Sequence, residues 1–213
     1  MDFERLMEIV GDQPVFETSL LLAGDVDRTN VQRQLSRWNK MGRLYQLRRG
    51  LYALAPPFQK VKPHPFLVAN RMVQPSYVSL QSALAHFGLI PEVVAVTTSV
   101  TTLRPGRWDT PLGSYAFRHV KTELFQDYRL LEVADEQQAF VASPEKALLD
   151  LVYLEPRADS HTYLKELRLQ NLEVLDLDRL QDHAELTSSP KLQRAAARVA
   201  ALARSDMTEY ERL

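Results

Sequence analysis

Acidic residues are missing from a long stretch of this chain. Between Arg28 and Pro91 the sequence has ten Lys or Arg and no Asp or Glu, although the 213 residues together carry a formal net charge of −1. After Pro91 the balance reverses, with fifteen basic residues against twenty acidic ones. A basic segment without counter-charges attracts polyanions, and nucleic acid is the first candidate.

Several other features are absent or scarce. Cysteine is absent, which excludes disulfides and thiolate metal sites. The seven glycines form no phosphate-binding loop, and the five histidines show no metal-ligand spacing, so we expect neither a metal nor a cofactor. No apolar run approaches the roughly 18–20 residues that span a bilayer, and the charged start of the chain is not a signal peptide. We therefore expect a cytoplasmic protein that does not contact membranes.

The pattern of residues 1–55 predicts three helices and then a β-hairpin. Hydrophobic periodicity predicts helices over residues 3–10, 16–23 and 29–41, the second with Leu20–Leu22 buried and Gly24 as its C-cap. Two short apolar runs around Arg48-Arg49-Gly50 predict the hairpin. This order is typical of a winged helix-turn-helix domain. Four prolines within Ala55–Pro65 then predict an extended, unpaired linker over residues 56–65.

Residues 66–213 are expected to form a mixed α/β C-terminal domain that ends in helices, which makes the whole chain α+β. We expect helices over residues 65–73 and 79–87 and strands over 93–102 and 112–120. Ser143-Pro144-Glu145 and Ser189-Pro190 are strong helix starts, with Ser as N-cap and Pro at the first helical position. On the helix that follows Ser143, we expect Glu145, Lys146 and Asp150 to form a solvated face with local ion pairs.

The helix expected over residues 29–41 has two distinct faces. Val31, Leu35 and Trp38 form an apolar stripe, and Arg33, Arg37 and Lys40 cluster on the opposite side. Such a helix fits the major groove of DNA, where its first turns reach the bases. We predict base contacts from Thr29, Asn30, Arg33 and Arg37. We predict phosphate contacts from Lys40 and Arg43, and contacts of the hairpin tip with the backbone or the minor groove from Arg48 and Arg49. The alternative is a cationic face that is merely solvated, although such faces normally mix charges of both signs.

Signals for catalysis are weak, and we expect no enzymatic activity. Asp176-Leu177-Asp178 could hold Mg²⁺ in a nucleotidyltransferase, but the only Gly-Ser pair, Gly113-Ser114, lies more than sixty residues away. An amphipathic segment is the simpler interpretation of the acidic pair. Ser143 lacks a nucleophile-elbow motif, so we expect it to act as a helix cap.

Several motifs resemble the AbiE-type antitoxins, which are the DNA-binding regulators of type IV toxin–antitoxin systems. The resemblance covers roughly residues 15–155. It is carried by residues 43–52 (RLYQLRRGLY), 75–84 (PSYVSLQSAL), 88–91 (GLIP), 96–99 (VTTS), 110–115 (TPLGSY), 117–120 (FRHV) and 142–150 (ASPEKALLD). The second and the last of these are the most specific.

This resemblance implies a function for each part of the chain. Residues 1–55 would repress the protein's own operon at inverted repeats in promoter DNA. Residues 66–213 would counter a nucleotidyltransferase-like toxin without forming a stable complex with it. The residues alone leave a second hypothesis open, a stand-alone winged-helix regulator whose α/β domain senses a small ligand.

Overall fold

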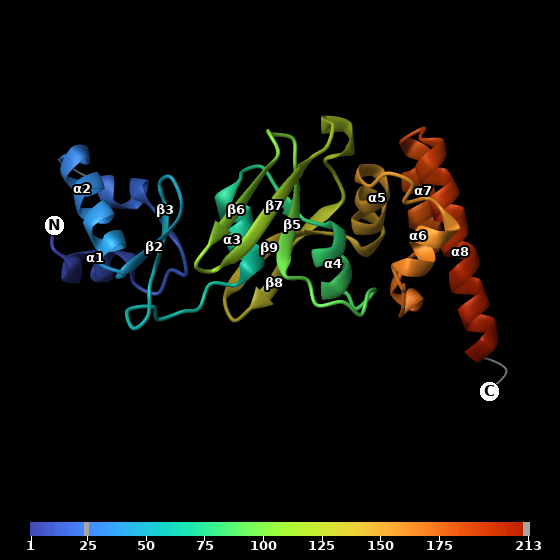
Figure 1. The fold of residues 1–213 in the computed structure, drawn as a ribbon, viewed down its shortest axis with the longest axis horizontal. Coiled ribbons are helices and arrows are strands. Elements are labelled where there is room, and N and C mark those ends of the chain that lie inside the picture. The colour runs from blue at the N-terminus through green and yellow to red at the C-terminus, as the bar shows by residue number, and fades with distance from the viewer. Residues whose placement is uncertain (24–25, 211–213) are drawn as a thin grey trace.

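The structure is a computed structural model that describes residues 1–23 and 26–210, with side chains through Ser205. The elements lie in sequence order along an elongated molecule (Figure 1). Helices and a small sheet form the N-terminal part, a larger sheet lies in the middle, and helices form the other end. The predicted α+β class is confirmed.

The N-terminal part combines helices with a three-stranded antiparallel sheet in the order β1-β3-β2. Its elements are α1 (Phe3–Val10), β1 (Phe16–Glu17), the 3₁₀ helix η1 (Thr18–Leu22), α2 (Arg28–Lys40), β2 (Leu44–Arg48) and β3 (Leu51–Leu54). The predicted first and third helices and the hairpin are confirmed within one residue at each end. Their apolar spacing and caps are local signals, which explains the agreement.

The helix predicted over residues 16–23 is wrong. Phe16 and Glu17 instead pair with β3 as strand β1, and only a 3₁₀ helix follows. The backbone N–H of Thr18 donates to the Gly50 carbonyl at 2.9 Å, which ties this segment to the hairpin and competes with α-helix formation. Leu21 is buried, but Leu20 and Leu22 are only half-buried. The predicted cap, Gly24, lies outside the described residues.

The proline-rich segment over residues 56–65 is not the unpaired linker that its composition predicts. It begins with a turn in which the Phe58 N–H donates to the Ala55 carbonyl at 2.9 Å. Farther along, the Gln137 side chain donates to the Lys62 carbonyl at 3.0 Å and accepts from the His64 N–H at 2.7 Å. The segment is therefore fastened to the C-terminal part by a side chain that is distant in sequence.

The middle of the molecule is a six-stranded mixed sheet in the order β6-β7-β5-β4-β9-β8. Its strands are β4 (Tyr77–Val78), β5 (Val96–Thr101), β6 (Gly106–Thr110), β7 (Gly113–His119), β8 (Tyr128–Ala134) and β9 (Gln137–Ala142). Only β5 and β7 were predicted. The β5–β7 and β4–β9 pairs are parallel, and the other neighbours are antiparallel. Strand β6 begins at Gly106, between the two predicted strands.

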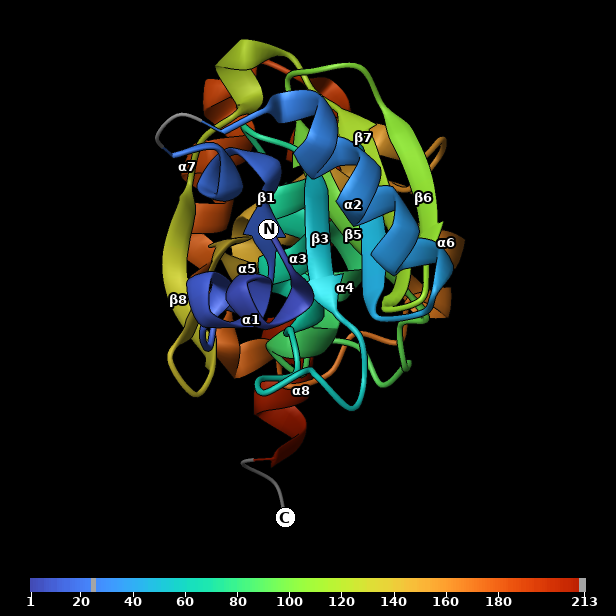
Figure 2. The same ribbon diagram turned by 90° about the vertical axis from the view of Figure 1, so that its left-hand side faces the viewer.

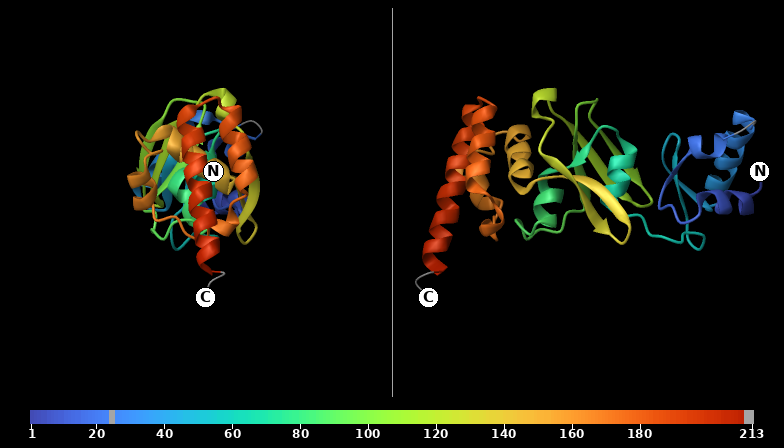
Figure 3. Two further views of the ribbon diagram at one scale, coloured as in Figure 1. Left: turned by 90° about the vertical axis from the view of Figure 1, so that its right-hand side faces the viewer. Right: turned by 180° about the vertical axis from the view of Figure 1, so that it is seen from behind.

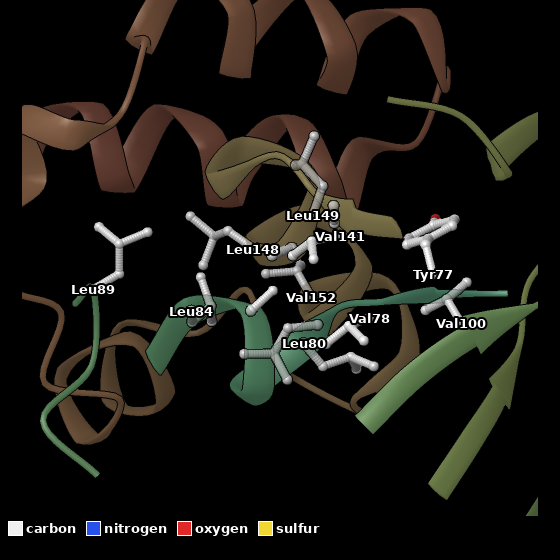
Figure 4. Packing of buried hydrophobic residues seen from close by; sticks show 14 of the residues in the cluster. Tyr77, Val78, Leu80, Leu84, Leu89, Val100, Val141, Leu148, Leu149 and Val152 are labelled. Carbon is white, nitrogen blue, oxygen red and sulfur yellow. The ribbon is translucent and has the colours of Figure 1, made fainter. Parts of the chain in front are cut away.

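Helices pack against this sheet and extend the core to the C-terminal end. They are α3 (Pro65–Met72), α4 (Leu80–His86), α5 (Pro144–Leu154), α6 (His161–Glu166), α7 (Leu177–Leu186) and α8 (Pro190–Tyr210). Helix α3 contacts β4, β5 and β9, and α5 contacts α4, α7 and α8. Figure 4 shows Leu80 and Leu84 facing Leu148 and Val152 in this core. The left panel of Figure 3 shows α7 and α8 side by side.

The alanine-rich stretch of α8 is a packing surface. Ala195, Ala196, Ala200 and Ala203 are all buried. No helix within the described residues has both the length and the apolar character that a membrane crossing requires.

Candidate nucleic-acid interface

Helix α2 is held in one rotational setting by its caps and its buried stripe. The Asp27 carboxylate accepts the Thr29 N–H at 2.8 Å at the start of the helix. Near its end, the Asn39 side-chain oxygen accepts the Gln46 N–H of β2 at 3.1 Å. Val31, Leu35 and Trp38 are at most 2% exposed, as predicted. The Trp38 ring also meets the Phe3 ring edge-on at 5.4 Å, which fixes α2 against α1.

The opposite face of α2 is open and cationic. Figure 2, which looks at this end of the molecule, shows α2 in front of the strands. The predicted base- and phosphate-contacting residues of the helix are all exposed, namely Thr29, Asn30, Arg33, Arg37 and Lys40. They span about 17 Å along the helix axis. Within the described residues, none of the three cationic side chains forms an ion pair or a hydrogen bond.

Arg43 packs against aromatic rings, unlike Lys40, the other residue predicted to contact phosphates. Its guanidinium carbon is 5.0 Å from the centre of the Phe3 ring and 5.9 Å from that of Phe58. Phe3 and Phe58 also pack edge-on at 4.9 Å. Cation–π contacts of this kind stabilise a partly exposed arginine in one position. Arg43 therefore links α1 to the segment over residues 56–65.

The hairpin β2–β3 is covered on both faces, which the sequence did not indicate. Leu44 and Tyr52 pack into the core formed with α1 and α2. Leu47, Leu51 and Ala53 instead belong to the core of the C-terminal part. Every residue of β3 is buried, so the strand does not show the alternation of a half-exposed hairpin. The sheet is consequently an interface between the two parts of the chain.

The two arginines at the hairpin tip have different surroundings. The Arg48 Nη2 donates to the Arg71 carbonyl of α3 at 3.5 Å. The Arg48 Nε is buried and has no partner in the described part of the chain. Arg49 is exposed. The tip therefore presents one free guanidinium, and the other is directed at the C-terminal part.

A second cluster of polar side chains lies inside the C-terminal part. The Asp150 carboxylate pairs with Lys146 one helical turn earlier on α5, and accepts hydroxyl hydrogen bonds from Tyr77 at 3.0 Å and from Ser79 at 2.8 Å. Lys146 and Asp150 are 6% and 2% exposed, and Glu145 is also buried. The predicted solvated face is wrong, because α4, α7 and α8 cover α5 from several sides.

Burial dominates the protonation of this cluster. Loss of hydration raises the pKa of Asp150, although the Lys146 ammonium and the two hydroxyl groups act in the opposite direction. Burial and the neighbouring Asp150 charge raise the pKa of Tyr77. A cavity of about 20 Å³ adjoins Lys146 and Asp150. A space of this size accommodates a single water molecule and no substrate. The cluster therefore joins β4 and α5 through buried hydrogen bonds and an ion pair.

The predicted cap and the acidic pair also connect structural elements. The Ser143 Oγ accepts the Lys146 N–H at 3.2 Å, which confirms the predicted helix cap, and donates to Asp127 at 2.6 Å. The Asp176 carboxylate accepts the Arg179 N–H at 3.0 Å and so caps α7. No group of three or more potential metal ligands occurs among the side chains that the structure describes.

Comparisons with known proteins add nothing to this geometry. A scan against protein-family models gives no match, and a search of curated proteins gives none.

Proposed function

We propose that this protein is a DNA-binding transcriptional autorepressor and antitoxin, and that residues 1–55 form its winged helix-turn-helix domain. The observation that carries the proposal is the open face of α2. Its cations have no counter-charge on the helix surface, while the opposite stripe fixes the helix in the core. An α-helix with its side chains fits the width of the major groove, and unpaired cations there replace the counterions of the phosphates.

The topology of the N-terminal part supports this assignment. Helix, short strand, helical turn, helix and hairpin follow one another, and the short strand pairs with the second strand of the hairpin. This arrangement places the sheet directly behind helix α2, so that the outer face of α2 stays open (Figure 2). The departure from the winged-helix pattern is η1, which replaces the second helix.

Individual roles on DNA follow from side-chain chemistry. Arg33 and Arg37 each have the donor geometry to bind guanine through two hydrogen bonds, and Asn30 can bind adenine in the same way. Lys40 and Arg49 are suited to phosphate contacts, which contribute affinity at any sequence. Arg43 and Arg48 act mainly within the protein, because their guanidinium groups already contact other parts of the chain.

The antitoxin role rests on the family resemblance, and the structure suggests where that role does not lie. The two most specific motifs contain Tyr77, Ser79, Ser143, Lys146 and Asp150, which are the residues of the buried polar cluster and its cap. These motifs therefore account for the fold of the C-terminal part. We infer that the toxin-neutralising residues lie on its exposed surface. Rescue of growth when the chain is co-expressed with a toxin encoded beside it tests this role.

The alternative is a stand-alone regulator whose C-terminal part senses a small ligand. A cavity of about 450 Å³ in the C-terminal part favours it. The gene next to that of this protein distinguishes the two, since an antitoxin requires a neighbouring nucleotidyltransferase-like toxin. The same DNA-binding site serves both hypotheses.

The proposed DNA interface is tested by replacing cations on the α2 face. Arg33→Ala and Arg37→Ala should each weaken binding to the protein's own promoter by about 1–3 kcal/mol and relax sequence preference. Arg5→Ala is the matched control, since Arg5 is exposed on α1 and is paired with Glu8. Fluorescence anisotropy with labelled promoter DNA measures all three. Equal losses for Arg5→Ala and Arg37→Ala would refute the assignment of α2.

A further inference from the structure

An open cavity lies beside the junction of the two parts of the chain. Its volume is about 450 Å³, and its lining comes from α3, the loop between α3 and β4, the strands β8 and β9, and Phe125 just before β8. Pockets for small molecules in proteins commonly measure about 300–1,000 Å³. The cavity is separate from the outer face of α2 and from the buried polar cluster around Asp150.

One wall of the cavity is aromatic and incompletely covered. Tyr128 meets Phe125 at 5.3 Å and Phe140 at 5.6 Å between ring centres. Phe140 is 43% exposed, and Leu130 beside it is 51% exposed. Tyr128 is itself stacked on the buried Tyr77 at 4.7 Å, which holds the wall in place. A ligand with an aromatic ring can pack on such a wall in an offset-stacked or edge-to-face arrangement.

The other end of the cavity is lined by Arg71, whose side chain is 43% exposed. The Arg71 Nε is buried without a hydrogen-bond partner in the described residues. Arg71 pairs with the Glu17 carboxylate at 4.0 Å, which is the limit of an ion pair. The neighbouring Asn70 amide is fully engaged, since it bonds the Ser76 carbonyl and both backbone groups of Phe140. Arg71 is therefore the group in this cavity that can receive an anion, and a carboxylate matches its planar donors.

We propose that this cavity binds a small planar aromatic carboxylate. The ring lies against Tyr128 and Phe140, and the carboxylate is bound by Arg71. A neutral ring would not pair with the Arg71 guanidinium, and a compact anion without a ring would leave the aromatic wall exposed. The combination of the two walls thus specifies both halves of the ligand.

The same residue connects the cavity to the proposed DNA-binding domain. The Arg71 carbonyl accepts the Arg48 guanidinium from the hairpin tip, and the Arg71 guanidinium faces Glu17 of β1. Thr18, which follows Glu17, donates hydrogen bonds to the Gly50 carbonyl in the hairpin turn. A carboxylate on Arg71 competes with Glu17, so occupancy changes the contacts that position the hairpin beside α2. This coupling rests on the proposed DNA-binding function, whereas ligand binding itself does not.

Binding is tested by nuclear magnetic resonance titration of the full chain labelled with ¹⁵N. The probes are salicylate and 1-naphthoate, with the neutral salicylamide as the matched control ligand. We expect the carboxylates to shift the side-chain amides of Asn70 and Gln138 and the backbone of β8 and β9. For ligands of this size, a Kd of about 1 mM is expected. The absence of these shifts up to about 10 mM of either carboxylate, or equal binding of salicylamide, would overturn the proposal.

Variants distinguish carboxylate binding by Arg71 from non-specific binding of aromatic compounds to the wall formed by Tyr128 and Phe140. Arg71→Gln should weaken carboxylate binding by about tenfold, and Arg104→Gln, which alters an exposed arginine outside the cavity, should leave it unchanged. Leu130→Glu changes an exposed side chain and introduces a repelling charge, so it should weaken binding without altering Arg71. Carboxylate binding that survives both Arg71→Gln and Leu130→Glu would place the anion elsewhere.

Coupling is measured by anisotropy with the protein's own promoter, with and without saturating salicylate. We expect the DNA affinity of the wild-type chain to change by about fivefold or more, and that of Arg71→Gln to stay constant. Unchanged affinity with the cavity occupied would overturn the coupling. A chain that fails to bind the promoter without any ligand would instead refute the proposed function, and the titration would still decide whether the cavity binds carboxylates.

Discussion

Removing the Asp150 carboxylate should destabilise the protein strongly. In Asp150→Ala the Lys146 ammonium stays inside the core without its partner, and the hydroxyl groups of Tyr77 and Ser79 lose their acceptor. Breaking one side of a buried ion pair typically costs about 3–5 kcal/mol. That is a large share of the roughly 5–15 kcal/mol that stabilises a typical folded domain. The loss should therefore be visible in any unfolding experiment.

Urea unfolding followed by circular dichroism gives the size of this effect. With an m value of about 2–3 kcal/mol per molar urea, the midpoint of Asp150→Ala should fall by roughly 1.5 M. The informative control is the double variant Lys146→Met, Asp150→Leu, which removes both charges together. Replacing a buried pair by apolar residues is often close to neutral, so the double variant should be more stable than Asp150→Ala.

Two results would refute this reasoning. One is a midpoint for Asp150→Ala within error of the wild-type chain, which would mean that the cluster is hydrated. The other is a double variant that is less stable than Asp150→Ala, which would mean that the pair contributes more than the cost of burying it. The first result would remove the structural role assigned to residues 142–150. The second would show that the Lys146–Asp150 pair stabilises the fold by itself, contrary to the cost expected for burying two charges.

Two further predictions concern the junction and the pH response. Leu51→Ala should cost about 2–5 kcal/mol in thermal unfolding, because Leu51 is fully buried between the two parts of the chain; a cost under about 1 kcal/mol would show that the parts are not packed together. Burial, followed by the charge of His86, lowers the pKa of His64, whose Nδ1 accepts the Phe66 N–H at 3.2 Å and caps α3. The folded state therefore binds the His64 proton less tightly than the unfolded state. The contribution of neutral His64 to folding stability is complete above the unfolded pKa of about 6.5, and it is lost as the pH falls through the lowered pKa of the folded state. His64→Asn keeps a cap acceptor that does not titrate, so urea midpoints should lose this part of their pH dependence, and an unchanged dependence would contradict the assignment.

Local signals in the sequence predicted the elements that carry the proposed DNA interface. The apolar stripe of α2 is encoded within a few turns of one helix, and the structure buries it as predicted. The Ser143 cap is equally local. The helix expected over residues 16–23 does not form, because β1 and η1 are held by hydrogen bonds from Thr18 to Gly50, which is thirty-two residues further along the chain. The leucines of residues 20–22 carry no information about the hydrogen bonds between Thr18 and the Gly50 carbonyl.

The buried polar cluster was hidden for a similar reason. Lys146 and Asp150 have the spacing of an exposed ion pair on a helix, and their burial depends on Tyr77 and Ser79, which precede Asp150 by 73 and 71 residues. The second face of the hairpin was also invisible, since its covering comes from α3 and the large sheet. The signal that could have suggested it is β3 itself, whose residues Leu51–Leu54 contain no polar side chain apart from the Tyr52 hydroxyl.

The central claim is that α2 reads the protein's own promoter, and competition binding at physiological salt tests it most directly. A labelled promoter fragment is titrated with the full chain, and unlabelled promoter or scrambled DNA of equal length is then added. Specific binding by α2 predicts that the promoter competes about a thousandfold better than scrambled DNA, and that affinity falls steeply as salt is raised. Equal competition by the two DNAs would contradict the account.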